Sequence, residues 1–572
     1  DLMRSGRYEP KSGGSEPARS FVMSGAAVVA TCRGQRVTLE ALSANGEAAL
    51  THITARLAHV AEIEERERRL AVLVFPARTT TVDLEARLRA PSPLDALRAL
   101  VSFEVTERAT PYALFCAGVF AYDFIDAFEA LPEPLSDPLG YPDFTFYLAE
   151  SLIAIEPAAG RMTVICTAFG SDDAVLARAI YNDGSTRLGA LVERCRAIVD
   201  RPQTRADRCF SNTRDTFTAT DLSLGETVDM DDATYAAQVV TLKENILAGD
   251  VFQVVPSRTF AAPCPRPIAA YEALRALNPS PYMFFLSAGD HVLFGASPET
   301  SVRVARSPSG AREVEIRPIA GTRRRGHAEG GGLDVDLDNR QETELLLDEK
   351  ERAEHMMLVD LARNDVARVC RPGTRRVERL LTVERFSHVM HLVSRVTGTL
   401  RDENDALCAY AAAMNMGTLV GAPKLRAAEL LRQREATKRG PYGGAIGYFT
   451  GEGELDTAVI IRSALVKDGV AHVRAGAGVV YDSDPAAEAD ETRRKAASVL
   501  TALRQASRAE HMVCANPVTT TPSSSPSGAM NSPEVPQSHP GDVTKSHPGD
   551  VTKSLPGDVT QSHPGEVILI DN

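Results

Sequence analysis

The chain has 572 residues, 44% of them hydrophobic and 24% charged, a composition typical of soluble globular proteins, and its length predicts about three domains. The formal net charge of −13 argues against nucleic acid as a main partner, because phosphate binding needs clustered Lys and Arg. The sequence has no run of roughly 18 apolar residues for a membrane span and no N-terminal secretory signal, so we expect a cytoplasmic protein without a membrane partner.

The nine cysteines are odd in number, scattered, and include no Cys-x-x-Cys pair. This usage predicts reduced thiols in a cytoplasmic protein, and neither a disulfide framework nor a zinc site. The first residue is not Met, which indicates that the sequence begins inside a longer reading frame.

The first part of the chain mixes strand and helix patterns. Residues 1–21 are predicted to be a disordered N-terminal segment, and residues 22–200 an N-terminal domain. Its clearest expected elements are strands at 35–39 and 69–75 and helices at 92–101 and 174–197. Residues 201–228 are polar and rich in Thr, Asp and Arg, which predicts a connector.

A denser region, residues 229–506, is predicted to form a second domain. Its expected helices, in chain order, are 233–248, 344–368, 406–414 and 486–504. Its expected strands are 250–255, 282–286, 292–294, 313–316, 444–449, 458–466 and 470–476. Because the strands come in antiparallel-looking groups with helices between them, we expect an α+β fold and not a doubly wound parallel sheet.

The last part of the chain changes composition to Pro, Ser, Thr and Val. Residues 507–566 are predicted to be a disordered low-complexity linker, within which an eight-residue Pro-Gly repeat offers about one Val per unit to bury. Residues 567–572 have the apolar pattern of a buried strand, which indicates the truncated start of a further domain.

Two pairs of glutamates stand three residues apart on expected helices. They are Glu351 with Glu354, and Glu488 with Glu491. Residues at i and i+3 share a helix face, and two converging faces would supply four carboxylates for a Mg²⁺ ion. A solvated helix surface is the alternative interpretation.

Glycine-rich turns at 320–322, 443–444 and 475–478 let a backbone approach an anion closely, although tight turns between strands are the commoner explanation of such glycines. Arg462 follows an apolar run inside an expected strand, where it pairs either with an anionic ligand or with a structural carboxylate. His391, between Met390 and Leu392, is either a general acid or base or a core residue.

Five segments resemble one family closely. They are residues 318–323, 358–365, 416–424, 475–480 and 488–492. This pattern is similar to that of the chorismate-utilising enzymes and, among them, to the large component of anthranilate synthase. The resemblance implies a large antiparallel β-sandwich flanked by helices, and it makes residues 229–506 the chorismate-binding catalytic domain.

The resemblance also implies roles for individual residues. Glu354 and Glu491 match Mg²⁺ ligands, with Glu351 and Glu488 beside them. His391 and Thr418 match residues that assist ring chemistry and the loss of pyruvate. The residues that match chorismate contacts are Gly321, Thr322, Tyr442, Arg462, Gly476, Gly478 and Lys495.

Two positions separate the relatives by mechanism. Where water-using members of the family have a Lys base, this chain has Gln253, which cannot take a proton from water. Where aminodeoxychorismate synthases have a Lys nucleophile, it has Ala320. Both positions favour direct attack by ammonia and hence anthranilate and pyruvate as products. A phenazine-type aminodeoxyisochorismate synthase is the alternative, and a catalytically silent scaffold is disfavoured because Glu354, Glu491 and Arg462 are present.

Regulation and nitrogen supply also follow from the resemblance. The family's tryptophan-feedback site combines a Leu-Leu-Glu-Ser element with a Pro-Tyr-Met, and only the second is present, as Pro281, Tyr282 and Met283. We therefore expect weak or absent inhibition by tryptophan. Residues 567–572 resemble the first strand of a glutamine amidotransferase domain, so an amidotransferase domain or subunit is the expected source of ammonia.

Overall fold

The computed structural model describes residues 19–77, 84–106, 112–133, 136–200, 225–307, 309–328, 332–386, 389–515 and 567–571. The expectations for residues 1–18 of the N-terminal segment, for most of the connector and for nearly all of the linker lie outside the described residues. The disorder expected at the end of the N-terminal segment was wrong, because Ser20 and Phe21 belong to a strand.

The first half of the chain contains seven strands and four α-helices among the described residues. In chain order the elements are β1 (Ser20–Arg33), β2 (Arg36–Ala41), α1 (Ala44–Leu57), β3 (Glu62–Arg66), β4 (Leu70–Val74), α2 (Leu84–Arg89), α3 (Leu94–Leu100), β5 (Phe115–Phe120), the 3-10 helix η1 (Tyr122–Ala127), β6 (Phe144–Glu156), the 3-10 helix η2 (Pro157–Ala159), β7 (Arg161–Cys166) and α4 (Ala174–Asp200).

The second half contains the remaining elements. They are β8 (Thr227–Val228), α5 (Asp232–Leu247), β9 (Gln253–Val254), β10 (Ser257–Pro263), α6 (Pro267–Leu277), β11 (Tyr282–Ser287), β12 (His291–Ser297), β13 (Thr300–Arg306), β14 (Arg312–Ile316), β15 (Ile319–Arg324), α7 (Val335–Leu347), α8 (Glu349–Val369), β16 (Arg376–Arg385), β17 (Val389–Thr399), α9 (Ala406–Ala413), α10 (Gly417–Val420), β18 (Gly421–Ala422), α11 (Lys424–Arg434), β19 (Ala445–Thr450), β20 (Leu455–Val459), β21 (Ser463–Lys467), β22 (Val470–Gly476), α12 (Pro485–Ala515) and β23 (Val567–Asp571).

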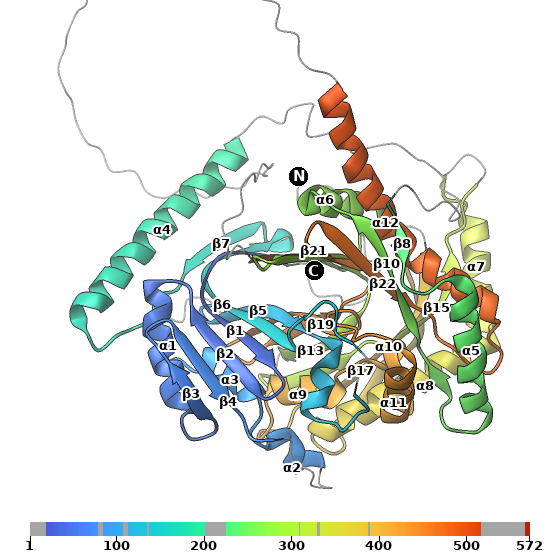
Figure 1. Cartoon of the computed structure of the whole chain (residues 1–572), viewed down its shortest axis with the longest axis horizontal. Helices are drawn as coiled ribbons and strands as arrows, with labels where there is room; N and C mark the ends of the chain where they lie inside the picture. Colours follow the sequence, from blue (N-terminus) through green and yellow to red (C-terminus); the bar gives the residue numbers. More distant parts are fainter. Residues whose placement is uncertain are drawn as a thin grey trace, which may run out of the picture.

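The strand pairings among the described residues are antiparallel, and helices cover the sheets, which confirms the expected α+β class. β5 of the first half pairs with β19 of the second, from Phe120 opposite Ala445 to Phe115 opposite Thr450. One sheet system therefore runs through both halves. In Figure 1 the strands and helices of the first half gather on the left, and α5, α7 and α8 lie on the right.

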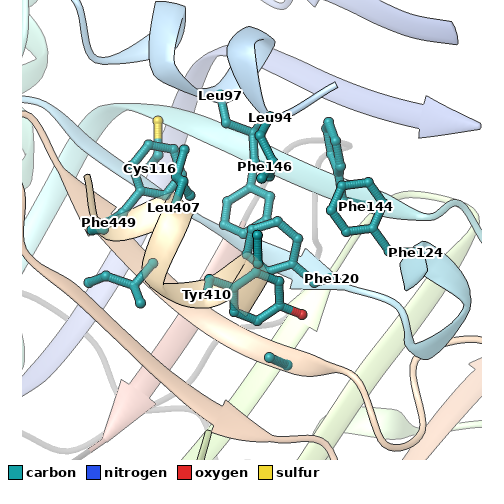
Figure 2. Packing of buried hydrophobic residues seen from close by; sticks show 14 of the residues in the cluster. Leu94, Leu97, Cys116, Phe120, Phe124, Phe144, Phe146, Leu407, Tyr410 and Phe449 are labelled. Atoms are coloured by element: carbon teal, nitrogen blue, oxygen red, sulfur yellow. The ribbon is translucent and has the colours of Figure 1, made fainter. Parts of the chain in front are cut away.

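The largest hydrophobic core is also shared by the two halves. Phe120 and Phe146 come from β5 and β6, whereas Tyr410 and Phe449 come from α9 and β19. The rings of Phe120 and Tyr410 stack with their centroids 4.0 Å apart, as the close view in Figure 2 shows. Because each half covers apolar surface of the other, burial of this core holds the two halves together.

Two expected elements are divided in the structure. The helix expected at 344–368 is two helices, α7 and α8, separated at Asp348, whose backbone is extended and whose side chain caps α8 by accepting from the Glu351 amide. The strand expected at 458–466 is β20 and β21, separated at Arg462, which has a left-handed φ of 51°. Placing Arg462 inside a strand was therefore wrong.

Other boundaries differ as well. The strand expected at 250–255 shortens to the two residues of β9, and the helix expected at 486–504 continues as α12 to Ala515. β16 and β17, which the sequence did not predict, form a long hairpin. β23 is a strand, as its apolar pattern predicts, and it pairs antiparallel with β1 and β11.

Candidate active site

Two long helices supply the four glutamates that the sequence spacing singled out. Glu351 and Glu354 lie on α8, and Glu488 and Glu491 lie on α12. Burial raises the pKa of Glu354 to about 7, and the charges of the other three carboxylates contribute to this rise. The two helices therefore place the other three carboxylates within electrostatic range of Glu354.

The four carboxylates offer the oxygen ligands that Mg²⁺ prefers. Among the residues that the structure describes, no group of three or more His, Cys, Asp or Glu side chains is arranged as a complete metal site. Cations pair with three of the four carboxylates: Glu351 with Arg323 at 3.2 Å, Glu354 with Lys350 at 3.9 Å, and Glu491 with Lys495 at 2.7 Å. Magnesium commonly binds through one or two carboxylates plus water and substrate oxygens, so this donor set fits the ion without a protein cage.

The β15–β17 pairing places His391 beside the Gly321 turn. Its Nδ1 lies 3.0 Å from the carbonyl oxygen of Gly321 and 3.0 Å from the hydroxyl of Thr322. A carbonyl oxygen can only accept, so Nδ1 carries the proton and Nε2 has a free lone pair. Burial lowers the pKa of His391 to about 4. The imidazole is therefore neutral at pH 7 and suited to accept a proton.

Gly321 itself has a left-handed φ of 73°, and a Cβ there would lie 3.2 Å from a carboxylate oxygen of Glu351. A side chain at this position would combine backbone strain with a crowded contact. The turn therefore brings β15 close to Glu351 of α8.

Arg462, Tyr442 and Lys495 lie around the other side of the carboxylates. Burial lowers the pKa of Arg462, and the charges of Tyr442 and Glu491 oppose that effect. Lys495 donates to the carbonyl oxygen of Gly476 at 3.0 Å. Glu491 interacts electrostatically with Arg462 and forms an ion pair with Lys495, so the arrangement can bind an anion beside the carboxylates.

The comparisons with known proteins agree with this geometry. Residues 10–501 match the model of a family described as chorismate binding enzyme. The chain belongs to the chorismate-binding enzymes.

Relatives of this chorismate-binding enzyme share most of their length with it. Anthranilate synthase component 1 of Vibrio cholerae is 47% identical over 85% of the chain and 88% of its own length. The Escherichia coli protein of the same name is 44% identical over 86% of the chain and 90% of its own length. The crystal structure of anthranilate synthase component I from Streptococcus pneumoniae has a TM-score of 0.64 and 28% identity, covering 87% of this chain and 95% of that one.

In this chorismate-binding enzyme, Gln253 lies against the glycine turn that follows β22. A Cβ on Gly478 would lie 2.6 Å from the Gln253 Nε2, so the glycine leaves room for the amide in this position. The side-chain oxygen of Gln253 is buried and has no hydrogen-bond partner among the described residues. Since an unpaired buried acceptor costs free energy, this oxygen is suited to accept from a bound molecule.

Glu299 is a candidate functional residue that sequence reasoning missed. Its buried carboxylate accepts from the Thr418 hydroxyl at 2.7 Å. Burial raises the pKa of Glu299 to about 7, and Thr418 and Lys495 act against the rise. A carboxyl group that is half protonated near neutral pH can donate a proton. The only signal in the sequence was a Glu two residues after β12, in Ser297-Pro298-Glu299.

The residues of the expected tryptophan-binding site, Pro281, Tyr282 and Met283, lie at the start of β11. Tyr282 is buried, and its hydroxyl bonds both Thr300 and the carboxylate of Asp456 at 3.0 Å. Tyr282 and Phe21 belong to one core cluster, in which Phe21 packs with its ring centroid 4.8 Å from that of Tyr448.

No helix among the described residues is long and apolar enough to cross a membrane.

Proposed function

We propose that this chain is the large component of anthranilate synthase, a cytoplasmic, magnesium-dependent lyase that converts chorismate and ammonia to anthranilate, pyruvate and water. One observation carries the proposal above all others: the side-chain oxygen of Gln253 is buried and has no hydrogen-bond partner among the described residues. The resemblance assigns this position to the base of water-using relatives. An amide oxygen can accept a hydrogen bond from ammonia but cannot deprotonate water. Relatives called anthranilate synthase component 1 support the same conclusion.

The two carboxylates of chorismate suit the two kinds of group in the site. Arg462 can pair with one carboxylate, and Lys495 lies between Gly476 and Glu491. Magnesium, held by Glu354 and Glu491, would supply Lewis-acid stabilisation for the other carboxylate and for the departing hydroxyl. Glu351 and Glu488 would complete the acidic surroundings of the ion.

Two proton transfers fall to residues of this chain. Ammonia forms the bond to ring carbon C2 while the C4 hydroxyl leaves, and Glu299 can protonate that hydroxyl so that it departs as water. His391 Nε2 can then take the proton from C2 as the bond from C3 to the enolpyruvyl oxygen breaks. The departing enolpyruvate takes up a proton and becomes pyruvate, the new amine releases the extra proton that it brought from ammonia, and the ring becomes aromatic. Thr418 would hold Glu299 in place during the first step.

Product identification tests this proposal and its nearest alternative. Purified chain is supplied with chorismate, Mg²⁺ and ammonium at a pH high enough to provide free ammonia, and products are separated by chromatography. We expect anthranilate and pyruvate in equal amounts. Isochorismate or aminodeoxychorismate as the end product would contradict the assignment, and unaromatised aminodeoxyisochorismate would establish the phenazine-type alternative.

A further inference from the structure

A buried group of charged side chains lies behind the candidate active site. We call it the Glu435 cluster, and it consists of Ser257, Glu435, Arg439 and Arg474, all buried. Glu435 accepts from the Ser257 amide at 2.9 Å, the Ser257 hydroxyl at 2.8 Å, Arg439 Nε at 2.8 Å, Arg439 Nη2 at 2.7 Å and Arg474 Nη2 at 3.0 Å. These bonds satisfy both oxygens of the carboxylate and fix the direction of both guanidinium groups.

Arg439 extends from this cluster to two backbone segments. Its Nη1 donates to the carbonyl oxygen of Leu419 at 2.7 Å, and its Nη2 to that of Val255 at 2.7 Å. Its guanidinium also lies over the ring of Tyr122, 4.4 Å from the centroid. Because the guanidinium is planar and its N–H directions are fixed, these contacts set the position of both carbonyl groups.

Each segment held in this way carries a residue of the candidate site. Leu419 follows Thr418 on α10, and Val255 lies two residues after Gln253. Tyr442 is three residues beyond Arg439, whose guanidinium lies 5.9 Å from the tyrosine ring centroid.

The fourth segment is β22. Arg474 lies two residues before Gly476, and Gly476 pairs with Ser257 across the β10–β22 ladder. Arg474 Nε donates to the Ser257 hydroxyl at 2.8 Å. The cluster thus joins four segments that are far apart in the sequence.

We propose that Arg439, clamped by Glu435, is a positioning residue that sets the mutual placement of Gln253, Thr418 and Tyr442, and thereby the affinity for chorismate. The proposal rests on the proposed function. Arg439 does not touch the substrate surface itself but holds the backbone that presents these groups. Two guanidinium groups against one carboxylate also leave one positive charge beneath Tyr442, which favours an anionic substrate.

Arg439→Lys tests the proposal, because lysine keeps the charge and loses the fork that spans the two carbonyl groups. We expect about a 100-fold fall in kcat/KM for chorismate, of the order that a displacement of about 1 Å produces. Chorismate binding, measured by calorimetry with Mg²⁺ and without ammonia, should weaken by about 10-fold, or about 1.4 kcal/mol.

The matched control is Arg504→Lys. Arg504 makes a similar two-pronged pair with Glu226, at 2.6 Å and 2.7 Å, on the distal part of α12. Its substitution should leave chorismate affinity and kcat/KM within about 2-fold of wild type. Circular dichroism and the unfolding temperature report the folding of both variants.

Equal effects of the two variants would overturn the proposal. So would an Arg439→Lys protein that loses thermal stability but keeps its chorismate affinity and turnover. If Arg439→Lys does not fold, Ser257→Ala removes two of the cluster's contacts and should still weaken chorismate binding; unchanged binding contradicts the positioning role. If wild type binds chorismate but makes no anthranilate, the proposed function fails while the comparison of affinities still tests the cluster.

Discussion

Glu299 and Glu354 both have a pKa raised to about 7, but the charges around the two carboxyl groups differ. Burial dominates at both positions, but Thr418 and Lys495 oppose it at Glu299, whereas neighbouring carboxylates add to it at Glu354. The first environment keeps one carboxyl available as an acid. At Glu354, neighbouring carboxylates repel one another, and a bound cation would reduce that repulsion. The two residues therefore receive different roles.

Glu299→Gln should therefore remove proton donation without removing the Thr418 contact. We expect kcat to fall by about 100-fold or more, the usual size of a general-acid contribution, with chorismate affinity nearly unchanged. Steady-state kinetics and calorimetry without ammonia measure the two effects separately. Unchanged kcat would exclude Glu299 as the acid.

The same pKa shift predicts how stability depends on pH. The native state holds protons on Glu299 and Glu354 that the unfolded state releases between the ordinary value of 4.5 and about 7. Their contribution to stability is present below pH 4.5 and is lost as the pH rises through 7. We expect Glu299→Gln to reduce the fall in unfolding temperature between pH 5 and pH 8 in metal-free protein. An identical fall in unfolding temperature in wild type and variant would contradict the raised pKa of Glu299.

The metal-ligand assignment makes a separate prediction. Glu354→Ala or Glu491→Ala should abolish turnover and weaken Mg²⁺ binding measured by calorimetry, because each removes one of the two carboxylate ligands. Glu349→Ala, at an exposed position in the first turn of α8, is the control and should leave both properties intact. Mg²⁺ binding that persists in both ligand variants would remove the assignment.

At the scale of elements, the breaks between helices and strands determine where the residues of the candidate site lie. Asp348 ends one helix and caps the next, which sets the face of α8 that carries its glutamates. The break at Arg462 separates β20 from β21, and the β15–β17 register sets Thr322 opposite His391. Caps, turns and register, more than the regular segments themselves, therefore determine the site.

β11 carries a prediction about regulation. The hydroxyl of Tyr282 is already bonded to Thr300 and Asp456, and the Leu-Leu-Glu-Ser element is absent from the sequence before Thr38. We expect tryptophan to inhibit weakly or not at all, because a ligand cannot shift an equilibrium between states that it does not bind. Initial rates at increasing tryptophan measure this effect. Strong inhibition would mean that residues of β1 form the missing wall of the pocket.

At the scale of the whole molecule, the supply of ammonia decides how the chain can act. The 572-residue chain by itself should use ammonium but not glutamine, because glutamine hydrolysis needs an activated cysteine. Burial raises the pKa of seven cysteines, Cys116 and Cys370 among them, so these thiols are poor nucleophiles.

The measurement compares anthranilate formation from glutamine with that from ammonium at the same chorismate concentration. Adding a glutamine amidotransferase subunit should restore activity with glutamine if that subunit is the partner. Equal rates from the purified chain alone would mean that it releases the amide nitrogen itself.

The sequence by itself determined the α+β class, the family, and the residue types of the site, because these depend on local periodicity and on short motifs such as the i, i+3 glutamates. It could not show that β5 pairs with β19 or that both halves share one core, since such contacts join residues far apart in the chain, such as Phe120 with Ala445 and Phe120 with Tyr410.

Only the tertiary structure decided which titratable groups are perturbed. Glu299 looked like an ordinary carboxylate in the sequence, and Arg439 and Glu435 drew no attention, because burial and partners from distant segments give them their properties. Arg462 was recognised as unusual, but its left-handed turn was not, since that conformation is imposed by the strands on either side. Electrostatics in a folded protein depends on desolvation, and desolvation is a property of the whole fold.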